Sequence, residues 1–437
     1  MVSSKGMRGR LLYAVVAAAA IATLSVGAAS ATRTATTTIT IMMQSTGTTP
    51  WDVVNANFEK AYPNIKVNMA YVPTATLPQV LLTQLQAGSG PDLFYGSGGS
   101  GGANSILPLA KQGYAADLSG QAWSKKLPSE FDPVEKIGTK RYMFPLDIPA
   151  IGIMYNPVLL KQEGFSVPAS FAQLLSLCKA AQSKGLSALT IAGAASPNVG
   201  LTSTALAANF VYAKDPSWDA KRAAKKVTFS GSPLWTDALR HFVAMVQGGC
   251  YQPGAQGAGG NAARGLVAAG KALGEVLPTA AYPQLTAVNP NIKLALAPFP
   301  ADKPNQQYLP ILASDSLAVN AHSKHLKEAI TYVNFLARTG QSRLMARLQG
   351  GFAWNDYKRL SQGTLDAKSF ARTGLNWAAG IQPTLKAKRV VTRLGALEWP
   401  NGQVYTVLAT DMQGLMTGQK TIAQTLSDMD TAYNQGG

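Results

Sequence analysis

Residues 36–112 alternate between two hydrophobic periods, one typical of strands and the other typical of helices. Runs rich in β-branched or apolar residues are each followed by a stretch in which apolar side chains return every three or four positions. Parallel strands need crossover connections, which are usually helices, so this order predicts an α/β fold whose parallel sheet is covered by helices. The predicted strands are 37–43, 65–72 and 92–95, and the predicted helices are 51–61, 77–87 and 106–112.

A similar alternation resumes after Tyr155. Helical spacing covers 174–184 and 233–246, short extended segments occupy 294–298 and 316–320, and the C-terminal part is mostly helical. A chain of 437 residues is long enough for two or three domains of ordinary size. The pattern therefore predicts more than one α/β unit.

The first 31 residues are typical of an export signal peptide. Three basic residues precede a nearly unbroken apolar run, 11–29, and Ala29-Ser30-Ala31 forms a small-x-small cleavage site. An uncleaved membrane anchor is the alternative, but the run is mostly Ala, which inserts weakly into a bilayer. No Cys stands at the junction to carry a lipid. We expect an exported protein of the periplasm or cell surface, without a lipid anchor.

Charge, histidine and cysteine content limit which partners, metals and cofactors the sequence favours. Removal of the signal leaves 36 Lys and Arg against 22 Asp and Glu, a net charge of +14. The basic residues are scattered, without the interleaved aromatic residues of a nucleic-acid channel, so we expect a solvated basic surface and no nucleic-acid partner. His322-x-x-His325 is typical of a solvated helix start, and we expect neither a metal nor a cofactor. Export leaves Cys178 and Cys250 open to two states, a disulfide or buried thiols.

A glycine-rich tract, Gly96–Gly102, matches two motifs at once. Its G-x-G-x-x-G pattern, with Asp117 downstream, is that of dinucleotide-binding loops, although such loops follow the first strand of their fold rather than the third. Its G-x-S-x-G pattern would make Ser100 the nucleophile of a serine hydrolase, with Asp315 and His322 or His325 in hydrolase order. Any run of Gly and Ser matches both patterns. We interpret the tract as a loop at the carboxyl end of a strand, where ligands bind in α/β sheets, and keep the hydrolase as an alternative.

Six segments, in order, resemble the carbohydrate-type extracellular solute-binding proteins of bacterial ABC importers, the family of the maltodextrin-binding protein. The resemblance covers nearly all of 37–435, and the segment 141–164 is its most specific part, centred on Pro145, Tyr155 and Asn156. The six segments are FEKAYPNIKV (58–67), AGSGPDLF (87–94), LPLAKQGYAADL (107–118), RYMFPLDIPAIGIMYNPVLLKQEG (141–164), PILASDSLAVNAHSK (310–324) and MTGQKTIAQTL (416–426).

The resemblance implies a periplasmic-binding-protein fold: two α/β lobes joined by a hinge, with a ligand cleft between them. Residues 32–147 with 299–318 would form the N-terminal lobe, and 148–298 with 319–437 the C-terminal lobe, with Pro145-Leu146-Asp147 as a crossing between them. The implied function is to capture a sugar or oligosaccharide and deliver it to the permease subunits of an ABC importer. Such a protein is a monomer and not an enzyme.

Sugar clefts need aromatic faces for stacking and planar polar side chains for hydroxyl groups. The strand ends, the crossing and the C-terminal region supply candidates, and Tyr405 matches a cleft aromatic of sugar-binding relatives. For each Trp, core packing is an equal alternative. The candidate ligand-binding residues are Gln44, Thr46, Tyr95, Ser97, Gly98, Asp147, Asn198, Asp315, Trp354, Trp399 and Tyr405.

One departure from the family pattern concerns the ligand. Family members often have G-x-W after a G-K-x-A-M stretch, whereas this chain has Gly270-Lys271-Ala272-Leu273 followed by EVLPTAAY (275–282), without Trp. Either Tyr282 substitutes or the ligand does not stack there. This leaves room for a smaller, acidic or phosphorylated solute such as a sugar phosphate. A polyamine binder would need several carboxylates, which this acid-poor chain makes unfavourable, and a binder of anionic envelope polymer is a further alternative.

Overall fold

The three predicted N-terminal strands lie side by side in one sheet. The computed structural model describes residues 36–45, 51–74, 76–102, 104–194, 196–312, 315–392 and 395–435. β1 (Thr37–Ser45) pairs in parallel with β2 (Ile65–Pro73) and with β3 (Leu93–Ser97). The crossovers contain α1 (Trp51–Ala61) and α2 (Leu77–Gln86), so the β-α-β-α-β prediction is confirmed.

Two later segments complete this sheet, in the order β2-β1-β3-β11-β6. β11 (Asp315–Val319) runs antiparallel to β3, and β6 (Phe144–Pro145) runs antiparallel to β11 at the edge. An edge is where Pro is tolerated, because it has no N–H for a further ladder bond. The sheet therefore joins residues separated by more than two hundred positions in the chain.

A second, three-stranded antiparallel sheet has the order β8-β7-β9. It consists of β7 (Ile151–Tyr155), β8 (Gly274–Pro278) and β9 (Ala295–Ala297). All five β7 residues are buried, because helices cover both faces of the sheet. Only residues 146–150 separate β6 from β7, so the chain passes from the first sheet to the second there, as Pro145-Leu146-Asp147 predicts.

Isolated β-bridges and two short strands connect this crossing to other parts of the chain. Ile148 bridges to Phe352 and Ala150 to Ile311, both antiparallel. Next to them, β10 (Leu309–Pro310) pairs in parallel with β12 (Val390–Val391). Four segments distant in the sequence therefore meet between the two sheets.

Separate hydrophobic cores surround the two sheets, and we call each sheet with its packed helices the first lobe and the second lobe. The first core includes Phe58 of α1 together with Tyr332 and Phe335, which come from much later in the chain. These two residues lie on α12 (Leu326–Leu336), which packs against β1 and β11, and α13 (Thr339–Gln349) packs against α1. This packing differs from the predicted assignment of 319–437 to the C-terminal lobe, because helical periodicity shows that a helix buries one face but not which sheet receives it.

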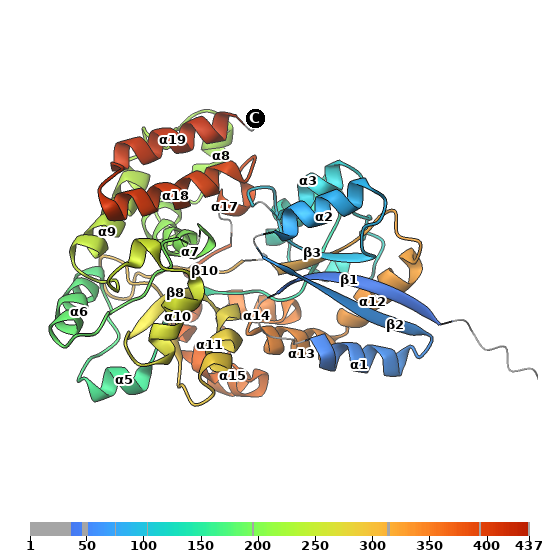
Figure 1. Ribbon diagram of the computed structural model, residues 1–437, viewed down its shortest axis with the longest axis horizontal. Helices are drawn as coiled ribbons and strands as arrows, with labels where there is room; N and C mark the ends of the chain where they lie inside the picture. The colour runs from blue at the N-terminus through green and yellow to red at the C-terminus, as the bar shows by residue number, and fades with distance from the viewer. Residues whose placement is uncertain are drawn as a thin grey trace, which may run out of the picture. The chain divides into compact units, whose positions relative to one another are not determined.

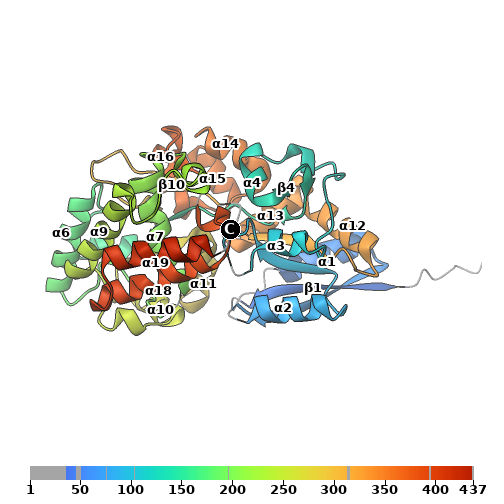
Figure 2. The same ribbon diagram turned by 90° about the horizontal axis from the view of Figure 1, so that it is seen from above.

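Helices from the middle and the end of the chain build the second lobe together. Figure 1 shows α18 and α19, drawn in red, beside α7 and α9, and Figure 2 shows the same neighbours from above. The main helices of this lobe are α6 (Phe171–Ser183), α7 (Ser196–Ala207), α9 (Pro233–Gln247), α18 (Gln403–Thr417) and α19 (Ile422–Asn434).

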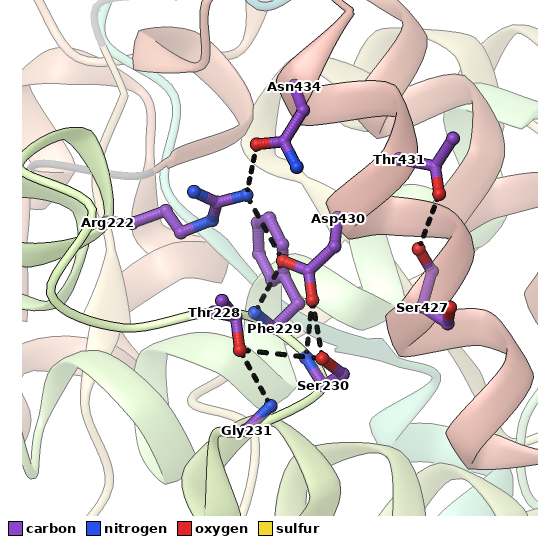
Figure 3. Close-up of polar contacts among 9 residues, drawn as sticks. All are labelled: Arg222, Thr228, Phe229, Ser230, Gly231, Ser427, Asp430, Thr431 and Asn434. Atoms are coloured by element: carbon purple, nitrogen blue, oxygen red, sulfur yellow. Dashed lines mark hydrogen bonds and ion pairs between the residues drawn. The ribbon is translucent and has the colours of Figure 1, made fainter.

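A polar network ties the C-terminal helix to the segment between α8 (Trp218–Ala223) and α9 (Figure 3). Asp430 of α19 accepts the backbone N–H groups of Phe229 and Ser230 at 2.8 and 2.9 Å. It also pairs with Arg222 of α8, whose guanidinium lies 4.0 Å from the ring centroid of Tyr433. Because Arg222 is buried, this charge pair and cation–π contact anchor α19 to the lobe.

The two cysteines form a disulfide, which settles the alternative that the sequence left open. Cys178 lies on α6 and Cys250 follows α9, and both are fully buried. The bond joins positions 72 residues apart and sits beside the hydrogen bond from Leu189 N–H to the Cys250 carbonyl. It therefore cross-links α6 to the turn after α9, next to the extended segment that leads toward α7.

Shorter elements fill the rest of the described chain, in which no helix is long and apolar enough to cross a membrane. The remaining strands are β4 (Lys136–Ile137) and β5 (Lys140–Arg141); the remaining α-helices are α3 (Ile106–Lys111), α4 (Asp132–Glu135), α5 (Pro157–Gln162), α10 (Gly260–Ala268), α11 (Tyr282–Val288), α14 (Tyr357–Ser361), α15 (Ala367–Thr373), α16 (Gln382–Lys386) and α17 (Gly395–Glu398).

Candidate ligand-binding site

A pocket lies where the carboxyl ends of β1 and β2 and the start of β11 face the start of α11. The empty space between its walls is about 500 Å³, which includes space open to solvent. Its walls mix polar and apolar side chains on both sides, and none of the described residues that line it is basic. The lining residues are Met43, Gln44, Trp51, Tyr71, Ala280, Pro283, Gln284, Asp315, Leu348 and Gln349.

Two of the predicted site residues, Tyr95 and Asp315, are hydrogen-bonded to each other at this end of the sheet. The antiparallel register of β3 and β11 places Asp315 opposite Ser97, two residues from Tyr95. The Tyr95 hydroxyl donates to Asp315 Oδ1. Burial raises the pKa of Tyr95 well above its ordinary value, and the negative charge of Asp315 raises it further. Tyr95 therefore stays a hydroxyl donor that holds the Asp315 carboxylate at the mouth of the pocket.

Asp147 is fully buried beside this pair, and neither of its carboxyl oxygens has a hydrogen-bond partner among the residues that the structure describes. The residue before it, Leu146, donates its N–H to the Asp315 carbonyl at 2.8 Å. On its other side a side chain at Gly351 would overlap Asp147 Oδ2. Burial raises the pKa of Asp147 well above its ordinary value, and the charge of Asp315 adds to the shift.

An unsatisfied buried carboxyl group costs stability in the absence of a ligand, and it makes stability depend on pH. The pKa of Asp147 is higher in the folded than in the unfolded chain. Its favourable contribution to the free energy of unfolding is therefore complete below the pKa of the unfolded chain, about 3.9, and is lost as pH rises through the raised pKa of the folded chain.

We expect Asp147→Asn to be more stable than the wild type by about 1–3 kcal/mol at pH 8, since the amide never ionises. The difference should shrink toward zero near pH 4, where both side chains are neutral. Urea unfolding of the two ligand-free proteins across this pH range measures it. A variant less stable than the wild type at pH 8 would mean that the Asp147 carboxylate has a stabilising partner.

Planar amides and one tyrosine complete the polar wall. Gln44, a predicted residue, is the next-to-last residue of β1, and Gln349 at the end of α13 has a buried amide nitrogen without a hydrogen-bond partner among the described residues. Tyr71 of β2 is 37% exposed, and its ring is an aromatic face on the first lobe. The sequence prediction missed Tyr71, Gln284 and Gln349. Tyr71 could have been found, because it stands near the carboxyl end of a predicted parallel strand, whereas Gln284 and Gln349 have no local signal.

The glycine tract makes contacts that neither motif predicts. Gly99 has φ +80°, and a side chain there would overlap the Leu397 carbonyl oxygen. That oxygen accepts hydrogen bonds from the N–H groups of Ser100 and Gly101 at 2.9 and 3.1 Å, and the Ser100 hydroxyl donates to the Trp399 carbonyl at 2.8 Å. Leu397 packs against both hydrophobic cores. The tract therefore joins the lobes through backbone hydrogen bonds to Leu397, and we call this contact the clasp.

The hydrolase alternative needs a histidine beside Ser100. His325 instead contacts Asp92 at 3.3 Å, just before β3, whereas the glycine tract follows the far end of that strand. His322 packs its ring edge-on against Tyr114, and Asp315 accepts from Tyr95. The described residues thus do not bring these groups together as a catalytic triad. They also contain no group of three or more His, Cys, Asp or Glu residues that could hold a metal ion.

The other predicted residues fall into different surroundings. The Ser97 hydroxyl donates to Asn104 Oδ1 at 3.0 Å, and Gly98 is buried next to the clasp. The Trp399 ring packs edge-on against Phe229, and its Nε1 donates to Asp219 at 3.2 Å. Trp354 is buried in the core of the first lobe, and Thr46 lies outside the described residues.

The remaining two, Asn198 and Tyr405, lie near each other on the second lobe. Asn198 is in the first turn of α7, and the Tyr405 ring covers Gly200 in the next turn. Tyr282, the suggested replacement for the family's Trp, stacks on Trp377 with ring centroids 4.3 Å apart. Its neighbours Ala280, Pro283 and Gln284 line the pocket instead.

Comparison with known proteins identifies the family. Residues 43–342, more than half of the chain, match the profile of the family described as bacterial extracellular solute-binding protein. The chain belongs to this family. Because the family is extracellular, this solute-binding protein is exported.

Several relatives of this solute-binding protein are characterised. A multiple sugar-binding protein of Streptococcus mutans is 25% identical over 297 residues, which are 64% of this chain and 66% of the relative. The structure of the solute-binding protein RafE with raffinose has a TM-score of 0.72 at 21% identity, covering 92% of this chain and 99% of that one. An ABC transporter solute-binding protein of Thermotoga lettingae bound with α-D-tagatose has a TM-score of 0.72 at 18% identity, covering 92% and 99%. These structures show the same two-lobed fold.

Proposed function

We propose that this protein captures a neutral carbohydrate in the pocket between the lobes and delivers it to the permease subunits of an ABC importer. The observation that carries the proposal is the composition of the pocket. Three amides, a carboxylate and a partly exposed tyrosine face the same space, and no basic side chain lines it among the residues that the structure describes. Amides and carboxylates satisfy sugar hydroxyls, and a tyrosine face suits the C–H-rich side of a sugar ring. The sugar-binding relative supports the same ligand class.

The pocket argues against an anionic solute, although the surface charge is strongly positive. Asp315 lines the pocket, and buried Asp147 lies next to it, so an anionic sugar would meet like charge, with no compensating Lys or Arg among the described lining residues. The net charge of the chain acts over long distances and does not determine the local field of a cleft. A sugar phosphate or uronic acid is therefore disfavoured, and a cationic amino compound is the alternative that two carboxyl groups would favour.

The remaining parts of the proposal rest on the fold. A binding role without catalysis agrees with Ser100 being engaged by the Trp399 carbonyl. For the lobes we propose the division of 32–147 with 299–318 and 148–298 with 319–437, changed in that α12 to α16, whose buried residues belong to the core around the first sheet, join the first lobe. Closure of such lobes around a ligand is the general basis of release to a transporter. We expect a monomer without a lipid anchor, located in the periplasm or at the cell surface.

Thermal unfolding of the chain from Thr32 onward, with a panel of solutes, tests the function. A neutral sugar at one hundred times its dissociation constant should stabilise the protein by about 2.7 kcal/mol and raise Tm by a few degrees, because it binds only the folded state. Uronic acids and sugar phosphates should give no shift. A panel without any sugar response, on protein shown to be folded and free of bound solute, would contradict the proposal, and a response to polyamines alone would replace it.

A further inference from the structure

More than half of the net charge of the exported chain comes from one stretch, residues 338–389. This stretch contains ten Lys and Arg residues and two Asp residues, a net charge of +8, whereas the whole chain after the signal carries +14. Residues 36–147, which supply most of the first sheet, contain eight basic and eight acidic residues. The positive charge of the first lobe therefore comes from the stretch that contains α13 to α16.

The helices of this stretch contact one another. Arg359 of α14 donates to the hydroxyl oxygen of Ser369 on α15 at 2.8 Å. In the turn after α14, a Cβ at Gly363 would overlap the Cα of Lys386, the last residue of α16. A Cβ on the glycine that caps the C-terminus of α15 would lie 3.0 Å from Arg347 Cδ on α13. Figure 2 shows α14, α15 and α16 together at the upper edge of the molecule. Their exposed side chains therefore belong to one continuous surface, which we call the basic face.

Both acidic residues of the basic face are engaged by neighbours. Asp356 accepts two hydrogen bonds from Arg343, at 2.7 and 2.9 Å, and Asp366 accepts the Ser369 N–H at 2.7 Å at the start of α15. Four lysines, by contrast, are exposed and form no ion pair within 4.0 Å among the described residues. They are Lys358, Lys368, Lys386 and Lys388. Their positive charges can therefore meet an anion from outside the protein.

A basic run on the second lobe, Lys221–Lys226, differs in this respect. Lys221 pairs with Asp215 at 2.7 Å, and Arg222 pairs with Asp430 at 3.2 Å. Opposite charges at such distances cancel much of each other's field farther away. The basic face, with five times as many basic as acidic residues, keeps its positive field.

We propose that the basic face binds a linear polyanion, a polymer with a negative charge on each repeat, at a site separate from the interlobe pocket. Exposed lysines spread over three neighbouring helices suit a partner whose charges also repeat along its length, and such binding gains free energy from the release of counterions. None of the described basic residues lines the pocket, so the polymer and the solute would not compete. This inference goes beyond the proposed function and does not depend on it.

A polymer fits the basic face better than a lipid bilayer does. Proteins that lie on a bilayer insert Trp, Phe or Leu side chains between the lipids. The large apolar side chains that are exposed in the described part of the chain all lie outside 338–389. The basic face thus offers charge without an apolar anchor. Because the protein is exported, it would meet the polymer outside the cytoplasm.

Titration of the chain from Thr32 onward with inorganic polyphosphate, at several salt concentrations, tests the basic face. The triple variant Lys358→Gln, Lys368→Gln, Lys386→Gln should bind polyphosphate at least about tenfold more weakly than wild type at about 50 mM salt. The slope of log affinity against log salt concentration should become shallower by about 2 to 3, since each lost phosphate contact releases about one counterion fewer.

The matched control is the triple variant Lys161→Gln, Lys179→Gln, Lys271→Gln. These lysines are also exposed and form no ion pair within 4.0 Å in the described part of the chain, but they lie on the second lobe. The control loses the same net charge, and we expect its affinity for polyphosphate to change less than about twofold. Both triple variants should keep the wild-type Tm and the wild-type thermal shift with sugar, because the substituted side chains are on the surface and outside the pocket.

Equal weakening in the two triple variants would overturn the basic face, because net charge alone would then explain binding. Wild type that binds no polyphosphate at about 50 mM salt would overturn it as well. So would wild type that binds vesicles of phosphatidylglycerol and phosphatidylcholine but not polyphosphate, which would indicate a membrane surface instead. Wild type that binds polyphosphate but no sugar would overturn the proposed function and leave the basic face intact.

Discussion

Replacing Cys178 and Cys250 together with Ala should lower the free energy of unfolding by about 4 kcal/mol. The disulfide closes a loop of 72 residues, and the entropy that such a loop would gain in the unfolded chain gives this magnitude. The loop contains α7, α8 and α9, three helices of the second lobe. Urea unfolding at neutral pH measures the loss.

The wild-type protein after reduction is the matched control for this variant, since it keeps both thiols and lacks only the bond. Both Cys side chains are fully buried, so the Ala variant should lose slightly more stability than the reduced protein because of the missing sulfur atoms. Unfolding midpoints that are equal before and after complete reduction would contradict the prediction.

Gly99→Ala should destabilise the protein by about 3 kcal/mol and loosen the contact between the lobes. The residue has φ +80°, which a side chain disfavours, and the new methyl group would overlap the Leu397 carbonyl oxygen. That oxygen would then lose its hydrogen bonds from Ser100 and Gly101. Thermal unfolding measures the loss, and small-angle scattering should show a larger radius of gyration without ligand.

Gly113→Ala is the matched control for this clasp. Gly113 has φ +84°, but nothing lies within 4 Å of the added atom, so this variant isolates the cost of the backbone conformation. We expect it to cost about 1 kcal/mol and to leave the radius of gyration unchanged. If the two variants behave alike, the clasp between the glycine tract and Leu397 does not stabilise the lobes.

The clasp also explains why the glycine tract matched two unrelated motifs. Positive φ and close backbone approach both select Gly, whatever lies opposite. In dinucleotide-binding loops the opposite group is a phosphate, and here it is the carbonyl of Leu397. The spacing of the glycines indicates the backbone conformation of the loop but not the group that lies opposite it. The sequence therefore could not distinguish a loop that binds a ligand from a loop that contacts another part of the protein.

Much of the fold could be predicted because its strands and helices are defined by local periodicity. The parallel pairing of β1 with β2 and β3 follows from the crossover helices between them. The antiparallel strand β11 was expected as an extended segment, but its place beside β3 was not. Pairing between segments more than two hundred residues apart leaves no trace in either segment's own pattern, since any half-buried strand has the same alternation.

In the candidate site too, the sequence predicted single residues, whereas only the folded structure shows their contacts. Tyr95 and Asp315 were predicted as separate residues, and the register of β3 and β11 makes them hydrogen-bonded partners. Trp399 was nominated as a stacking face, and its ring packs against Phe229 with its Nε1 bonded to Asp219. An aromatic residue in a loop has the same sequence signal in a core and in a cleft, because only the surrounding segments determine which face stays open.

The sequence by itself determined the α/β elements, the crossing at Pro145-Leu146-Asp147 and, through the resemblance carried by six segments, the family. These depend on short-range preferences: backbone propensity, turn residues and motifs that a single stretch of chain contains. The tertiary structure alone decided that Asp147 is buried without a hydrogen-bond partner among the described residues, that the glycine tract binds Leu397 and that Glu275 faces Arg264. Burial and partnership are properties of packed segments, so they exist only once the chain has folded.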